Sequence, residues 1–125
     1  KTAVEELMRF DTPLHIFDRW VLEDLEYKGQ TFKKGAEVSL VLGAANRDPN
    51  VFQRADEIVL ERQKNQHVSL GGGIHFCIGA PLARLELQTS LPILMSRFPQ
   101  LQLHEAPSYA NSYHFHGLET LIVSH

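Results

Sequence analysis

The feature that most constrains this chain is a glycine-rich segment with a lone cysteine, directly before a long apolar helix. Residues 70–81 read LGGGIHFCIGAP, and Cys77 is the only cysteine in the sequence. The proline that ends the segment suits the first turn of a helix, and apolar residues then recur mostly at helical spacing. We therefore expect a helix over 80–98, with its apolar stripe packed in a core and with Pro92 kinking it or ending it early.

The rest of the chain predicts short elements of both kinds. A helix is expected over 1–10, because apolar residues recur at helical spacing before an Asp-Thr-Pro turn. Short extended pieces between turns predict a small mixed or antiparallel sheet over 16–42, and short strands are expected over 100–125. The expected strands are 16–22, 25–28, 36–42, 101–104 and 120–124, with an irregular stretch over 43–69 and a loop over 70–79. This pattern predicts the α+β class.

Composition bounds the class of protein. A length of 125 residues fits one domain, and a net charge of −3 argues against a non-specific nucleic-acid binder. The longest apolar run is far shorter than the ~20 residues that a membrane-spanning helix needs. A single cysteine excludes an internal disulfide and favours a reducing compartment, the cytoplasm. The chain starts at Lys1 within a predicted helix, so we expect a fragment.

The local sequence leaves four interpretations of Cys77 open. A cysteine just before a helix N-terminus lies near unpaired N–H groups and partial positive charge, which favour the thiolate. The thiolate could be an axial haem ligand, a catalytic nucleophile or a zinc ligand. A buried structural cysteine is the fourth interpretation. No second cysteine supports zinc, and no local signature supplies the histidine base that a nucleophile needs.

The segment around Cys77 resembles the haem-binding loop of the cytochrome P-450 family, the haem-thiolate monooxygenases. Two further stretches agree in the family's order: residues 3–10 resemble its Glu-x-x-Arg helix, and residues 43–49 resemble its short element after the central sheet. The resemblance implies the C-terminal part of that mainly α fold. The matching loop positions are Gly71, Gly73, His75, Cys77, Gly79 and the run Ala80–Glu86.

The resemblance implies a role for each residue near the cofactor. Cys77 would be the proximal thiolate ligand to the iron of haem b. His75 would hydrogen-bond a haem propionate, and Arg19 falls where family members place a propionate-binding arginine. The other cofactor-contacting residues would be Phe76 and Ile78, which keep water away, and Gly71, Gly73 and Gly79, which let the backbone approach.

A charged pair is implied to be structural. Glu6 and Arg9 are three residues apart, so their side chains share one helix face, and Arg62 is the expected third member. Two positions depart from the family pattern. Leu70 replaces the usual phenylalanine, and Glu57 stands where an arginine is common, so that its charge would repel Glu6.

The resemblance also implies an activity. The parent protein would activate O2 to hydroxylate a small organic substrate, with electrons from a ferredoxin-type or flavin redox partner and no nucleic-acid or membrane partner. No counterpart of the family's oxygen-activating helix is found in these residues, so the fragment alone is expected to be inactive. Its apolar surface is expected to favour self-association. The alternative is a haem-free remnant with a structural or interaction role.

Overall fold

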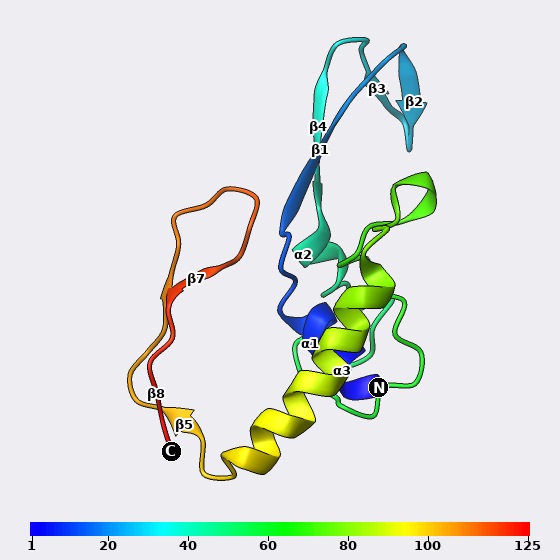
Figure 1. The fold of residues 1–125 in the computed structure, drawn as a ribbon. Coiled ribbons are helices and arrows are strands. Elements are labelled where there is room, and N and C mark those ends of the chain that lie inside the picture. Colours follow the sequence, from blue (N-terminus) through cyan, green and yellow to red (C-terminus); the bar gives the residue numbers. More distant parts are fainter.

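The fold is described by a computed structural model covering residues 1–125. Figure 1 shows a helical centre from which a long two-stranded arm rises, while the C-terminal arm starts at the far end of α3 and runs back beside the body. The elements in chain order are α1 (Thr2–Phe10), β1 (Ile16–Trp20), β2 (Leu25–Tyr27), β3 (Gln30–Phe32), β4 (Glu37–Val41), α2 (Leu42–Ala45), a 3-10 turn (Gly73–His75), α3 (Ala80–Arg97), β5 (Gln102–Leu103), β6 (Ser108–Tyr109), β7 (Leu118–Thr120) and β8 (Val123–Ser124).

The strands pair as four separate two-stranded antiparallel ladders: β1 with β4, β2 with β3, β5 with β8, and β6 with β7. The sequence did not predict β3, β6 or β7 as strands. The β2–β3 hairpin turns at Lys28 and Gly29, which both have positive φ, 49° and 78°. Two positive φ values in a two-residue turn match the right-handed twist of the flanking strands. The turn between 25–28 and the next segment is thus confirmed, and the residues after it pair back as β3.

The register of the longest ladder fixes which residues face the helical centre. Ile16 lies opposite Val41 and Arg19 opposite Val38. Because side chains alternate between the faces of a strand, Phe17 and Arg19 share one face of β1. That face is turned towards the glycine-rich segment.

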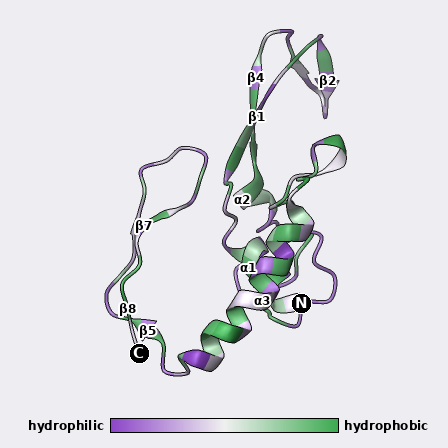
Figure 2. Ribbon diagram, viewed as in Figure 1, coloured by the Kyte–Doolittle hydropathy of each residue, from purple (hydrophilic) through white to green (hydrophobic).

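Helix α3 differs from its prediction in two ways. It continues through Pro92 to Arg97 without ending early. Pro92 lies on an exposed part of the helix, where solvent is free to hydrate the carbonyl that loses its N–H partner. The predicted packing of the apolar stripe is wrong within this chain: Leu82 and Leu85 are 59% and 63% exposed, and the one buried residue of α3 is Ala80. Figure 2 shows hydrophobic residues along α3, most of which is exposed.

The core is small and lies where α1 meets the irregular stretch between α2 and the glycine-rich segment. Only ten of the 125 residues are buried, and half of these are polar or charged. The buried apolar residues are Val4, Met8, Phe52, Ala55 and Ala80, and the buried polar ones are Glu6, Arg9, Thr12, Asn46 and Ser69. Hydrogen bonds therefore hold this centre together as much as apolar contacts do. No helix here combines the length and apolar character required to cross a bilayer.

Candidate functional site

The segment around Cys77 folds back on itself through its own backbone. The N–H of Cys77 donates to the carbonyl of Leu70 at 2.9 Å, and the N–H of Gly71 donates to Val68 at 2.9 Å. Gly71 and Gly73 have φ of +76° and +57°, a region that side chains disfavour. Cys77 is exposed at the end of this loop, three residues before α3 begins.

Gly71 is where the loop is most sensitive to an added side chain. A Cβ at Gly71 would lie 2.9 Å from the backbone oxygen of His75, whereas a Cβ at Gly72 meets nothing within 4 Å. We expect Gly71→Ala to destabilise the protein by about 1–3 kcal/mol, and Gly72→Ala to cost under about 1 kcal/mol. Urea unfolding of both variants measures this. Equal losses would contradict the assigned role of the loop backbone.

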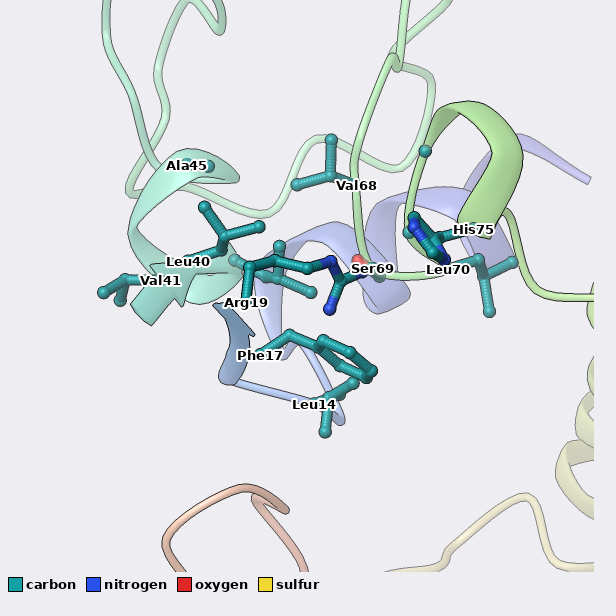
Figure 3. Close-up of a pocket in the computed structure, with 13 residues that line it drawn as sticks. Leu14, Phe17, Arg19, Leu40, Val41, Ala45, Val68, Ser69, Leu70 and His75 are labelled. Carbon is teal, nitrogen blue, oxygen red and sulfur yellow. The ribbon is translucent and has the colours of Figure 1, made fainter. Parts of the chain in front are cut away.

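A pocket of about 600 Å³ lies between this loop and β1 (Figure 3). Its wall is mostly apolar, with Leu14 and Phe17 from the β1 side and Leu70 from the loop. Arg19 and His75 extend into it from opposite sides and are its two basic residues. Leu70, the departure from the family pattern, thus keeps this wall apolar.

Arg19 is held in position along β1. Its guanidinium carbon lies 4.2 Å from the centre of the Phe17 ring, and one NH donates to the carbonyl of Asp18 at 2.8 Å. The other N–H groups of its guanidinium face the pocket and donate to no protein acceptor. A planar guanidinium with free N–H groups matches the geometry of a carboxylate.

The predicted cofactor contacts divide into two groups. Arg19, His75 and Gly71 meet at the pocket. The others lie on the outer part of the loop, beyond the pocket wall: Cys77, Phe76, Gly73, Ile78 and Gly79. Phe76 and Ile78, on either side of Cys77 in the chain, are 50% and 101% exposed, and the Arg84 guanidinium lies 5.9 Å from the centre of the Phe76 ring.

These residues fit a haem. An exposed thiol can supply one soft anionic ligand to iron. Arg19 and His75 can donate hydrogen bonds to two carboxylates, and the apolar wall suits a porphyrin edge. Gly79, whose Cβ position lies 3.7 Å from the Cys77 Sγ, leaves the sulfur uncovered from that side.

Glu6 is the centre of a buried charged network beneath the loop. Its carboxylate accepts hydrogen bonds from Arg9 Nε and NH2 at 2.9 and 2.8 Å, and from Arg62 Nε at 2.9 Å. The N–H of Val59 and the amide of Asn65 donate to it as well, at 2.8 and 3.0 Å. Every carboxylate lone pair therefore has a donor, which is what a fully buried charge needs.

Arg9 uses its whole guanidinium. Besides the two bonds to Glu6, its NH1 donates to the carbonyls of Asn46 and Ala55 at 2.8 Å each, and its NH2 donates to Glu57 at 2.9 Å. These carbonyls belong to the irregular stretch. One side chain of α1 thus fixes a region that has no regular structure of its own.

The expected repulsion between Glu57 and Glu6 is absent. Glu57 contributes its backbone carbonyl to Arg9, while its carboxylate turns outward and pairs with Arg54 at 2.6 Å. Because this side chain is exposed and paired with Arg54, its negative charge is screened and does not repel Glu6. The departure from the family pattern therefore leaves the network intact.

The pKa of Glu6 shows that its hydrogen bonds outweigh the cost of its burial. Burial raises the pKa, but the hydrogen bonds from Arg9, Val59 and Arg62 outweigh it and lower the pKa from 4.5 to about 2. A carboxylate with a depressed native pKa contributes stability above its unfolded pKa and loses it as the pH falls through the native value. The network should therefore lose stability between pH 4.5 and about 2.

A comparison with Glu6→Gln tests this pH window. Glutamine does not titrate, so the difference in unfolding free energy between wild type and variant should stay constant above pH 4.5 and shrink towards about 2. Urea unfolding over a pH series measures this difference. A difference that is already lost near neutral pH would show that Glu6 is not ionised through these contacts.

Two further sets of contacts were not predicted from the sequence. The side chain of Asn46 is fully buried: its amide donates to Thr12 and Ser69 at 2.7 and 2.8 Å, and its carbonyl accepts from the N–H of Val68. It joins the end of α1 to the irregular segment that leads into the loop. The one available signal was its place in the 43–49 stretch that resembles the family.

The second set joins α1 to α3. Arg84 donates to both oxygens of Glu5 at 2.7 and 2.9 Å, and the His67 ring contacts Glu5 at 3.0 Å. The hydrogen bond from Arg84 is the largest cause of the lowered pKa of Glu5. Glu5 thus anchors the helix that follows Cys77. Arg84 lies in the run that resembles the family, but nothing in the sequence paired it with Glu5.

Comparison with known proteins agrees with this geometry. The family model described as Cytochrome P450 matches residues 1–116. The chain is 44% identical to the polyketide biosynthesis cytochrome P450 PksS of Bacillus subtilis over 98% of its own length. It is 41% identical over 98% of its length to the biotin biosynthesis cytochrome P450 of the same organism. It spans 31% of each of these relatives.

Solved structures show the same likeness. The PksS structure superposes with a TM-score of 0.95 at 43% identity, covering 98% of this chain and 33% of that one. The structure of P450BioI, solved in complex with a hexadec-9Z-enoic acid ligated acyl carrier protein, also gives 0.95 at 41% identity, covering 99% and 32%. The fold and the sequence match point to one family. The chain belongs to the cytochrome P450 family, and a haem cofactor follows from that membership.

Proposed function

We propose that this chain supplies the proximal, haem-ligating part of a monooxygenase that hydroxylates a small organic substrate. The observation that carries the proposal is the exposed thiol of Cys77, held on a closed loop beside a pocket that contains Arg19 and His75. When bound, haem b supplies the activation of O2. The protein residues bind the haem, orient it and exclude water from one of its faces.

Each residue has a distinct part in this proposal. The sulfur of Cys77, three residues before α3 begins, would ligate the iron. Arg19 and His75 would bind the two propionates and so fix how the ring is rotated in its plane. Phe76 and Ile78 would keep the sulfur dry, which matters because a desolvated thiolate interacts more strongly with the metal.

Glu6, Arg9 and Arg62 support the site without touching it. They hold the irregular stretch that leads to Leu70. We propose that electrons reach the site from a ferredoxin-type or flavin partner. Because the chain spans 31% of the relatives it matches, we propose that the wall opposite Cys77 comes from the rest of such a protein.

The reduced carbon monoxide difference spectrum tests the proposal. Haem added to the purified protein should give a Soret band strongly shifted to longer wavelength, as thiolate ligation produces. Absence of haem uptake would overturn it in favour of a haem-free structural or interaction module. Rapid alkylation of Cys77 at neutral pH together with indifference to haem would instead favour a cysteine nucleophile.

A further inference from the structure

A second group of metal-binding side chains lies apart from Cys77, where the C-terminal arm meets the end of α1. Asp11 directly follows α1, His15 directly precedes β1, and His116 lies in the loop between β6 and β7. The ligand atoms of these three side chains all lie within 4.8 Å of one another. The His116 Nε2 is already 3.3 Å from the Asp11 carboxylate.

The backbone holds the two histidines in fixed register. The N–H of His15 donates to the carbonyl of His114, and the N–H of His116 donates to the carbonyl of Pro13, both at 2.9 Å. An isolated antiparallel bridge pairs Leu14 with Phe115 between them. Positioning on paired backbone, rather than on free loops, is what a metal site needs to keep its ligands together.

The surroundings leave room for an ion and pack against the two rings. A pocket of about 360 Å³ adjoins the three side chains. The Tyr109 ring stacks on His116 with centres 4.3 Å apart, and Gly43 lies against the His15 ring.

One cation already lines this pocket, and its charge is engaged elsewhere. Arg47 donates to the carbonyl of Phe10 at 2.8 and 3.2 Å and to Asp56 at 3.2 Å. Its guanidinium carbon lies 3.7 Å from the centre of the Phe10 ring. The carboxylate of Asp11 therefore has no arginine partner among the ion pairs of the structure and keeps its charge for another cation.

We propose that Asp11, His15 and His116 bind a divalent transition-metal cation, with Zn²⁺ as the best fit. Zinc takes imidazole nitrogen and carboxylate oxygen together, and solvent can complete a tetrahedron. Ligands at about 2.0–2.2 Å around such an ion lie roughly 3.5 Å apart, so the group must close slightly. The stacked His15 and His116 rings, now 4.1 Å apart, would turn about their last side-chain bond to aim at one point.

The metal would clamp the C-terminal arm onto the body of the protein. Leu14, next to His15 in the chain, lines the pocket beside the glycine-rich loop. An ion that joins His15 to His116 would thus fix Leu14 and its bridge partner Phe115. The inference concerns residues outside the haem site and stands independently of the proposed haem chemistry.

Isothermal titration of Zn²⁺ into the full chain, first stripped with EDTA, tests the site. We expect one Zn²⁺ per chain, with affinity reduced at least about 10-fold by His15→Gln and by His116→Gln. Asp11→Asn changes an exposed residue and should weaken binding while leaving the circular dichroism spectrum unchanged. His104→Gln, an exposed histidine elsewhere in the same arm, should bind Zn²⁺ as wild type does.

The opposite results would overturn the inference. These are no binding of Zn²⁺ at micromolar concentration, or binding that all three cluster variants keep at wild-type affinity. Thermal unfolding gives a second measurement, because a metal that binds the native state raises the midpoint in proportion to its saturation. A rise of equal size in wild type and Asp11→Asn would also count against the site.

Discussion

Replacing Cys77 with alanine is expected to abolish the red-shifted Soret band of the reduced carbon monoxide complex, while the protein stays folded. The thiol is exposed, and the hydrogen bonds of Cys77 to Leu70 and Ala80 use its backbone N–H and carbonyl, which alanine keeps. Its removal should change the free energy of unfolding by less than about 0.5 kcal/mol. The spectrum, the ratio of haem to protein and urea unfolding measure the three effects.

Ser90→Ala is the matched control, since it removes one exposed polar atom from α3 without approaching the loop. It should leave both the spectrum and the stability unchanged. A red-shifted band that survives in Cys77→Ala would show that another residue ligates the iron. Such a result would reject the role assigned to the loop.

Arg9→Lys is expected to cost about 3–5 kcal/mol of stability, the scale for breaking a buried ion pair. All five N–H groups of Arg9 donate to protein acceptors, two to Glu6 and three to backbone carbonyls. Lysine has three donors on one nitrogen, so it cannot fork across Glu6 and reach the carbonyls too. The loss is comparable with the whole stability of a small domain, so the variant should be largely unfolded.

Arg54→Lys is the control, because Arg54 forms an exposed pair with Glu57 and such pairs contribute about 0–1 kcal/mol. Circular dichroism and urea unfolding compare the two variants. Similar midpoints for both would mean that the buried network does not hold the irregular stretch in place.

Sequence reasoning succeeded where local chemistry decides the outcome. The glycine-rich segment, the helix after it and the pairing of Glu6 with Arg9 all depend on neighbours within a few positions. The family resemblance also placed Arg62 beside Glu6, and its Nε donates to the Glu6 carboxylate at 2.9 Å in the structure. The family of the chain followed from the same loop and is now shown by the comparisons.

The failures share a different physical cause. Periodicity says which face of α3 is apolar but not what covers it, and in this chain most of that face is exposed. Glu57 was expected to act through its charge, yet it acts through its backbone carbonyl, which every residue possesses. Asn46 bonds to partners 23 and 34 positions away, so no local pattern could reveal it.

The scarcity of buried side chains has a calorimetric consequence. The heat-capacity increase on unfolding reflects mainly the apolar surface that becomes hydrated, about 12–15 cal/mol/K per residue in ordinary domains. With ten of 125 residues buried and half of them polar, this chain should fall well below that average. The free energy of unfolding should accordingly vary little with temperature. Scanning calorimetry of the isolated chain would measure a small heat-capacity increase, as expected when ionic hydrogen bonds rather than apolar burial hold the fold together.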